Sequence, residues 1–446
     1  MSDVPAFNPP CFSPPCGPVS GWRDGDVVRA TGIPYATAGR FQPPASAPDW
    51  TEVLAATSLS PACPQGPVPF LDDILGTRYG ELPGSEDCQR LSITIPAGLA
   101  DGERVPVMVW LHGGSYTSGS GDLAIFDPKT LVAENRVIVV SVTYRLGLFG
   151  YLATGTGRPG NLGLLDQLEA FRWVQRNIRA FGGDPERVTA FGQSAGGDAV
   201  AHLMATPEAA SLFQRAIIQS APLGITRGRE KMNAAMGVAA EHVTEDTPAM
   251  DVVAIEGRVS QVARKYGLKA AMPFGTQYGH APLPPEHEIE AAWNSAASGI
   301  EVLIGHTADE ARMFLPGNPV AGRLAKIPVV GTAVVNAVSR AVTQAVYGRA
   351  ARKFARRHAR AGGKAYSYVL TWAAPGNYFG AAHTVDLPLL FGNKQTWATA
   401  GLVAGATWDD IDAQGRALRA IWARFASGEG LDTRGELPGT LRYRSA

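Results

Sequence analysis

Short apolar runs alternate with amphipathic stretches over much of the chain. Residues 105–111 are almost wholly apolar, as expected of a strand that is buried on both faces of a sheet. Similar runs predict further strands at 136–144, 187–191, 216–218, 300–304 and 365–370. Apolar residues at helical spacing predict helices over 164–181, 198–205 and 411–425. This alternation indicates an α/β fold with a mainly parallel central sheet and helices on both faces.

Several regions depart from this alternation. Residues 1–16 are rich in proline and predict an irregular arm. Residues 17–65 carry short alternating segments broken by Gly and Pro, which favours small antiparallel strands at a sheet edge. Residues 225–297 and 315–362 lie between the later core strands and predict cap-like excursions over an active-site mouth. No internal repeat or low-complexity linker interrupts residues 17–446, which are therefore expected to form a single domain.

The second excursion carries a cationic helix face. Its basic side chains recur at helical spacing: Arg349, Arg352, Lys353, Arg356, Arg357 and Arg360. A solvated face is the simplest interpretation, and a site for anions or for a membrane is the alternative.

The overall charge of the chain favours no polyanionic partner. Its 446 residues include 40 basic and 40 acidic ones, so no global field favours nucleic acid or an anionic membrane. Residues 1–10 lack the basic and apolar regions of a signal peptide, and no apolar run reaches the roughly 18 residues that span a bilayer. We expect a soluble, cytoplasmic protein without an integral membrane segment. Secretion by a non-classical route stays open.

The four cysteines form two pairs along the chain, Cys11 with Cys16 and Cys63 with Cys88. No histidine lies near either pair and the spacings are not those of a zinc site, so no metal is expected. Disulfides and free thiols both stay open, because disulfides without a secretory signal would have to survive a reducing compartment.

A nucleophile motif follows the strand predicted at 187–191. Residues 192–196 read G-x-S-x-G with Ser194 at the centre, between a strand and a helix-compatible run. This context presents a serine on a strained turn, and Gly192 and Gly196 keep the turn free of Cβ clashes. With 51 glycines in the chain, the motif alone is not decisive. It needs an oxyanion hole, a base and an acid in the right order.

The first of these partners precedes the elbow. Residues 112–115, His-Gly-Gly-Ser, directly follow the buried strand at 105–111, where an oxyanion loop is expected. Glycine lets backbone N–H groups turn toward a developing negative charge. Ala195 supplies a further N–H because it directly follows the nucleophile.

The acid and the histidine follow the elbow in that order. The loop after the strand at 300–304 offers two adjacent carboxylates, and spacing does not choose between Asp309 and Glu310. Two histidines lie beyond them. His358 stands among arginines and is expected at the surface, whereas His383 follows the strand at 365–370 and is the candidate base.

Several motifs make the chain resemble the type-B carboxylesterases, a family that includes cholinesterases, bacterial p-nitrobenzyl esterases and the non-catalytic neuroligins. The resemblance covers nearly all of residues 17–430. The motifs are GIPYA at 32–36, SEDC at 85–88, WLHGG at 110–114, GNLGLLDQ at 160–167, FGGDP at 181–185, ADE at 308–310 and WARFA at 422–426.

The resemblance implies an α/β-hydrolase fold and a serine carboxylic-ester hydrolase that needs no cofactor or metal. It implies Ser194 as nucleophile, His383 as base and Glu310, rather than Asp309, as acid. The oxyanion donors that it implies are the N–H groups of Gly114, Ser115 and Ala195. It also matches Cys63 and Cys88 to the family's N-terminal disulfide loop.

Some positions depart from the family's pattern. Gln193 stands where the family often has Glu, which removes a negative charge beside the nucleophile. The loop between Cys63 and Cys88 has no Trp to hold a quaternary ammonium by cation–π attraction, so choline esters are not expected. Thr384 and Asp386 replace a common Gly and Glu without removing a member of the triad. The segment before His383 is short, which predicts a reduced cap and an open mouth.

We therefore expect a hydrolase of neutral, small to medium esters that works through an acyl-enzyme. An amidase, thioesterase or lipase with the same triad is the alternative, since these enzymes share fold and residues. A neuroligin-like binding module would need a broken triad, and all three members are present. A small-molecule ester is the expected partner, and the oligomeric state stays open.

Overall fold

A large mixed sheet crosses the molecule in this computed structural model, which describes residues 9–78, 80–155, 157–315 and 330–446. Its strands run in the order β15-β16-β14-β13-β12-β11-β9-β10-β8-β4-β3. Their bounds are β3 Trp22–Asp24, β4 Val27–Pro34, β8 Arg90–Pro96, β9 Val105–Leu111, β10 Ile138–Thr143, β11 Gly183–Gln193, β12 Arg215–Gln219, β13 Glu301–Thr307, β14 Ala365–Leu370, β15 Arg434–Leu437 and β16 Leu441–Ser445. The strands from β10 to β14 pair in parallel, and antiparallel strands complete both edges.

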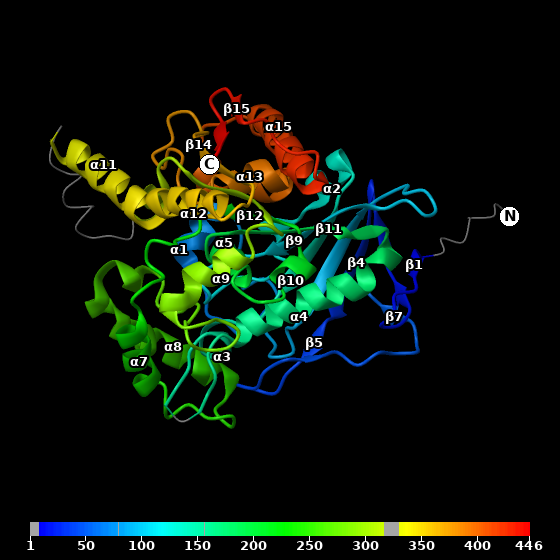
Figure 1. Cartoon of the computed structure of the whole chain (residues 1–446), viewed down its shortest axis with the longest axis horizontal. Helices are drawn as coiled ribbons and strands as arrows, with labels where there is room; N and C mark the ends of the chain where they lie inside the picture. The colour runs from blue at the N-terminus through cyan, green and yellow to red at the C-terminus, as the bar shows by residue number, and fades with distance from the viewer. Residues whose placement is uncertain (1–8, 79, 156, 316–329) are drawn as a thin grey trace.

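Helices cover both faces of this sheet (Figure 1). The main ones are α2 (Lys129–Asn135), α4 (Leu162–Asn177), α5 (Ala195–Leu203), α13 (Asp386–Phe391) and α15 (Trp408–Ser427). Side chains of β9 alternate between two cores: Val109 belongs to the core that also holds Leu168 of α4, and Trp110 to the core that holds Trp422 of α15. Burial on both faces explains the apolar run that predicted this strand. The predicted α/β-hydrolase fold is confirmed.

The N-terminal region is more regular than its sequence indicates. Residues 11–12 form β1 and pair with β2 (Val19–Ser20), so the arm is not irregular throughout. Phe12 fixes it by packing on Phe181, with the ring centroids 4.7 Å apart. The expected antiparallel edge is present as β3 and β4, whereas β2 pairs in parallel with β7 (Leu54–Ala55). A pair of short strands, β5 (Ala36–Thr37) and β6 (Ala45–Ser46), lies outside the main sheet.

Two insertions follow the central strands. The first joins β12 to β13 and contains α7 (Glu230–Ala239), α8 (Ala249–Ala263) and α9 (Ile289–Ser295), of which α7 and α8 lie at the lower left of Figure 1. The second joins β13 to β14. It contains a 3-10 turn, η5 (Glu310–Phe314), then α11 (Val330–Thr343), a π-helical turn, η6 (Gln344–Gly348), and α12 (Arg349–Arg360). Residues 316–329 of the predicted second excursion lie outside the described residues. The division into arm, domain and cap stays a prediction.

The remaining helices are short: α1 (Pro69–Leu75), α3 (Gly147–Gly150), α6 (Ala209–Leu212) and α14 (Lys394–Trp397). In the part of the chain that the structure describes, no helix combines the length and the apolar character needed to cross a membrane.

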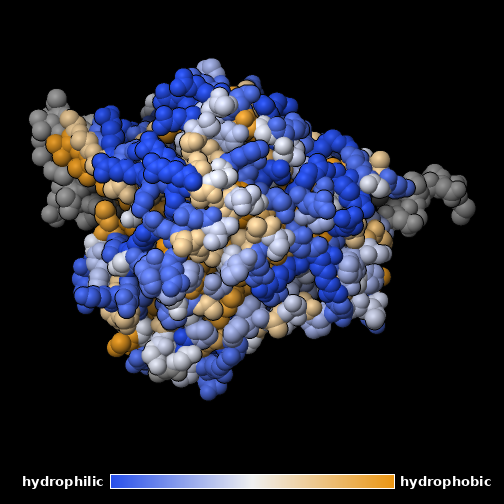
Figure 2. Space-filling view, in the orientation of Figure 1, coloured by the Kyte–Doolittle hydropathy of each residue, from blue (hydrophilic) through white to orange (hydrophobic). Residues whose placement is uncertain are grey.

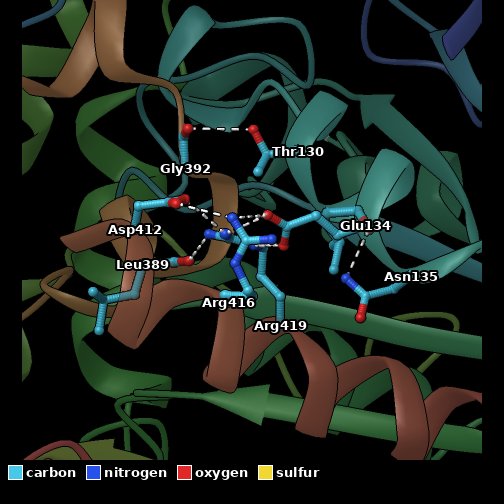
Figure 3. Close-up of polar contacts among 9 residues, drawn as sticks. Thr130, Glu134, Asn135, Leu389, Gly392, Asp412, Arg416 and Arg419 are labelled. Carbon is cyan, nitrogen blue, oxygen red and sulfur yellow. Dashed lines mark hydrogen bonds and ion pairs between the residues drawn. The ribbon is translucent and has the colours of Figure 1, made fainter. Parts of the chain in front are cut away.

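A buried ion cluster fastens α15 to α2 and α13 (Figure 3). The side chain of Arg419 is fully buried and donates two hydrogen bonds to Glu134, of 2.6 and 2.9 Å. It also donates to the carbonyl of Leu389 at 2.7 Å and to Asp412 at 3.2 Å. Because α13 begins three residues after His383, this cluster helps to position the loop that carries that histidine.

Candidate active site

Ser194 lies on a strained turn between β11 and α5. Its φ of 58° and ψ of −122° are unfavourable for a residue with a Cβ atom. The turn is held because the Ser194 N–H donates to the carbonyl of Gln219 at 2.9 Å. A Cβ atom at position 196 would lie 1.9 Å from the carbonyl oxygen of Leu111, so Gly196 lets the helix approach β9. The geometry explains both the motif and the need for its glycines.

His383 lies in a loop beside this turn. Its Nδ1 is hydrogen-bonded to Oε2 of Glu310, and its Nε2 lies 3.2 Å from the side-chain nitrogen of Gln193. Phe314 and Tyr347 flank the ring, with centroid distances of 5.5 and 5.4 Å. No hydrogen bond joins His383 to Ser194 among the described residues. In apo structures such bonds are often long and tighten only when substrate is bound.

The structure brings Glu310, and not Asp309, to the histidine. Oε1 of Glu310 accepts the backbone N–H of Thr307 at 2.8 Å, which aims Oε2 at the ring. Burial alone would raise the pKa of Glu310, but attraction to His383 and the hydrogen bond from its ring hold that pKa below the ordinary value. Asp309 points elsewhere, with Oδ1 3.7 Å from Nε of Arg312. Spacing could not make this distinction, because it depends on how η5 begins.

These facts also fix the tautomer of His383. An ionised carboxylate only accepts hydrogen bonds, so Nδ1 of His383 carries the proton that it shares with Glu310. The other nitrogen, Nε2, then has a free lone pair that accepts an N–H of the Gln193 amide. The buried side chain of Gln193 therefore hydrogen-bonds Nε2, the nitrogen that would accept a proton if His383 acted as a general base. The sequence singled out this residue for its missing charge and gave no sign of this contact.

A Gly-rich loop after β9 faces the elbow. Gly114, Ser115 and Tyr116 all have positive φ values, of 112°, 55° and 60°. A Cβ at Gly113 would lie 3.2 Å from the Cβ of Ser194, so the loop passes directly over Ser194. Nδ1 of His112 lies 2.8 Å from the carbonyl oxygen of Gly113, and this hydrogen bond holds the orientation of that carbonyl group. Burial lowers the pKa of His112 to about 4, so this ring is neutral near pH 7.

The amides of this loop and of the elbow can serve an anion. In the described residues, the N–H groups of Gly114 and Ser115 have no hydrogen-bond partner within the protein. Ala195 is the first residue of α5, where the helix dipole and unpaired N–H groups favour negative charge. The predicted donors at Gly114 and Ser115 thus have N–H groups that remain available to a ligand.

Two further histidines, His358 and His306, are buried, and the first of them differs from its sequence-based prediction. The expectation that His358 lies at the surface is wrong, because α12 turns this side chain inward and its Nε2 lies 2.7 Å from the carbonyl oxygen of Ile300. The neighbouring arginines suggested an exposed position for His358. However, one face of a basic helix must still pack on the sheet, and His358 lies on that face. His306 is also buried and hydrogen-bonds the carbonyl of Thr307 at 2.7 Å.

A second buried carboxylate, Asp386, lies near Glu310. Burial raises its pKa to about 6, and the nearby Glu310 carboxylate adds to the effect. Gln219 donates a hydrogen bond of 2.6 Å to Asp386 and, through its own carbonyl, holds the N–H of Ser194. No sequence pattern indicates Gln219, because its contacts depend on β12 lying beside β11.

The cysteines are free thiols in this structure. Cys63 and Cys88 are buried side by side, and a hydrogen bond to Cys63, followed by burial, raises the pKa of Cys88. The disulfide that the resemblance implies is therefore not formed here, although the two residues meet. Among the described residues, no group of three or more His, Cys, Asp or Glu side chains could hold a metal ion.

Comparison with known proteins adds to this geometry. The sequence profile of the carboxylesterase family matches residues 12–325. A "probable N-octanoylanthranilate hydrolase" of Rhodococcus erythropolis is 37% identical, and the alignment covers 92% of this chain and 91% of that protein. Para-nitrobenzyl esterase of Bacillus subtilis (strain 168) is 39% identical over 67% of this chain and 62% of its own. Among solved structures, a thermophilic PNB esterase superposes with a TM-score of 0.76 at 30% identity, over 93% of this chain and 90% of that one.

Proposed function

Since this chain belongs to the carboxylesterase family and is a carboxylic-ester hydrolase, we propose that Ser194, His383 and Glu310 are its catalytic triad. The observation that supports this most directly is the buried contact between Glu310 and Nδ1 of His383. It leaves Nε2 as the proton acceptor, and Gln193, which directly precedes Ser194, lies at that nitrogen.

The proposed reaction has two halves. Oγ of Ser194 attacks the ester carbonyl while Nε2 of His383 takes the hydroxyl proton, which displaces the Gln193 amide from that nitrogen. The tetrahedral intermediate expels the alcohol, which receives the proton from His383, and an acyl-enzyme remains. A water molecule then attacks the acyl-enzyme by the same proton transfers and releases the acid. Glu310 keeps the ring oriented and stabilises the imidazolium.

The oxyanion forms twice in this sequence. We propose that the N–H groups of Gly114, Ser115 and Ala195 bind it, and one such donor is typically worth about 3 kcal/mol of transition-state stabilisation. Their positions are preset by the positive φ values of the loop and by the start of α5, so little reorganisation is needed when charge develops.

Labelling at the serine tests this assignment. Wild-type protein incubated with a fluorophosphonate should carry one adduct at Ser194, located by mass spectrometry. Ser194→Ala should lose the label and should lower kcat by roughly 10⁴–10⁶ on p-nitrophenyl esters. A folded protein that hydrolyses these esters but is labelled at another residue would overturn the assignment of the nucleophile.

We propose neutral esters of small to medium size as substrates. The neutral Gln193 at the base supports this, as does the lack of a Trp in the loop between Cys63 and Cys88. Amide hydrolysis is a second candidate, because the relative from Rhodococcus erythropolis is named as a hydrolase of N-octanoylanthranilate, an amide. Comparing kcat/KM for p-nitrophenyl octanoate and for N-octanoylanthranilate separates the two, because an esterase alone would turn over only the former.

A further inference from the structure

The second insertion presents an exposed helix face that changes character halfway along. Helix α11 continues through η6 into α12, and α11 projects from the body at the upper left of Figure 1. The exposed apolar residues are Ala333, Val334, Ala337, Val338, Ala341 and Ala345, and the exposed basic residues that follow are Arg349, Lys353, Arg356 and Arg360. Steps of three or four residues keep both sets on one side of the helix. We call this surface the docking face.

The first half of the docking face is unusually apolar for a surface helix. Val334 and Val338 are 40% and 51% exposed, and Arg340 is the one exposed charged residue of α11 among its described side chains. The opposite side of α11 already packs on the body, where Thr343 accepts the N–H of Ala311 at 3.2 Å. Figure 2 shows hydrophobic colour on α11 beside strongly hydrophilic colour on α12.

The second half of the docking face is cationic and largely unpaired. Lys353 meets Glu290 at 3.0 Å, but within the described residues the guanidinium groups of Arg349, Arg356 and Arg360 have no hydrogen bond or ion pair. By contrast, the exposed Arg416 of α15 is paired with Asp412 at 3.0 Å. Three arginines without a partner among the described residues thus lie on one helix of a chain that has no net charge.

The lowered pKa of Arg352, which also lies on α12, reflects the same concentration of positive charge. Burial lowers the pKa of Arg352, and the positive charges of Arg356, Arg444 and Arg349 lower it further. Arg444, from β16, is a member of the same cationic region but belongs to another element. Like charges that repel each other without a local counterion are complementary to an anionic surface.

We propose that the docking face binds the surface of a lipid bilayer that contains anionic lipids. The apolar residues of α11 enter the interface, and the basic residues of α12 lie over the phosphate groups. A bilayer satisfies both halves at once. Nucleic acid would leave the apolar half in water, and a second copy of the chain, paired through its apolar half, would leave the basic half without counterions.

Binding to a bilayer would also define the substrate class, an inference that rests on the proposed catalytic function. The 3-10 turn η5, which begins with Glu310, contacts α11: Nη2 of Arg312 donates to Oδ1 of Asn336 at 3.1 Å. The same turn ends at Phe314, which is 46% exposed and whose ring lies 5.5 Å from that of His383. One turn thus contacts both α11 and His383, and esters dissolved in the bilayer are the substrates that we expect.

Vesicle co-sedimentation tests the docking face without using catalysis. The full chain is mixed with phosphatidylcholine vesicles, with or without phosphatidylglycerol, at low and high salt. We expect binding that needs phosphatidylglycerol and weakens with salt. Arg356→Gln with Arg360→Gln should lower the partition coefficient about fivefold per charge removed. Arg264→Gln, an exposed cation on another segment, is the matched control and should change little.

A second pair of variants tests the apolar half. Val334→Ser with Val338→Ser should lower vesicle binding, whereas Val238→Ser, 66% exposed on α7, should not. All these variants should keep the wild-type kcat on a soluble ester. Equal sedimentation with and without phosphatidylglycerol, or equal losses in the control variants, overturns the proposal. So does a dimer, measured by light scattering, that the two serine substitutions dissociate.

The proposal and the catalytic assignment fail separately. Ser194→Ala should bind vesicles as the wild type does, because it leaves the docking face intact. Fluorophosphonate labelling reports the nucleophile whether or not vesicles bind.

Discussion

The contact between Gln193 and His383 makes a pH profile the sharpest probe of the proposed base. Gln193→Glu keeps the size of the side chain but adds a carboxylate near Nε2, from which the amide nitrogen is now 3.2 Å distant. That carboxylate favours the imidazolium form of His383, which cannot accept the serine proton. The variant should need a higher pH to become active.

The magnitude follows from the distance. Opposite charges about 4 Å apart attract by about 4 kcal/mol at an effective dielectric constant near 20. The site around Gln193 is buried, so desolvation of the new carboxylate cancels part of this attraction. Close opposite charges usually shift a titration by about 1–3 pH units. We therefore expect the acidic limb of kcat/KM to move up by at least about one unit.

The assay is kcat/KM for a neutral p-nitrophenyl ester between the acidic limb and neutral pH, in wild type, Gln193→Glu and Gln193→Leu. The leucine variant removes the amide without adding charge. The acidic limb of its kcat/KM profile should therefore stay within about 0.3 pH units of the wild-type limb, even if kcat itself differs. An unshifted limb in Gln193→Glu, with the protein folded, would refute the placement of this side chain at the base.

Other substitutions test the acid, the fold and a buried carboxyl group. Glu310→Gln should lower kcat by about 10⁴, as loss of a triad acid does, whereas Asp309→Asn should cost less than about tenfold; a larger loss from Asp309→Asn would contradict the assignment. Arg419→Met removes the buried cation of Glu134 and leaves only Arg416, 3.6 Å away, so urea titration should find the free energy of unfolding lower by about 3 kcal/mol. Burial raises the pKa of Glu256 from 4.5 to about 8, so the folded state retains a proton that the unfolded chain loses and stability falls as pH rises through this window. Glu256→Gln should match wild type near pH 4.5 and be more stable by several kcal/mol above pH 8, measured by thermal or urea unfolding.

The core strands were predictable because burial on both faces leaves a plain mark. β9 and β14 have the bounds that their apolar runs predict, and the elbow has the order of strand, serine and helix that its glycines require. β8 was missed although it pairs with both β4 and β10. Its sequence, with Ser92 and Thr94 between apolar residues, alternates like an edge strand. The position of β8 inside the sheet is due to its antiparallel pairing with β4 and β10, and its own sequence pattern does not indicate it.

Contacts between distant segments were beyond the sequence. The motif identified Gln193, but its contact with His383 joins residues 190 positions apart and depends on how two loops meet. The inward turn of His358 depends likewise on which side of α12 packs on the sheet. The cationic face was visible as a spacing, whereas the apolar half of the same face became visible only when α11 and α12 proved to be continuous.

One short turn links the choice of acid to the docking face. The backbone carbonyl of Asp309 accepts the N–H of Arg312 at 2.9 Å and starts η5, so Asp309 turns outward and Glu310 inward. The same turn sends Arg312 to Asn336 and Phe314 to the surface beside His383. If η5 began one residue earlier or later, Asp309 and Glu310 would exchange their orientations. The contact between Arg312 and Asn336 of α11 would then be lost as well. The acid and the docking face therefore depend on one local conformation, and a shift of η5 would alter catalysis and vesicle binding together.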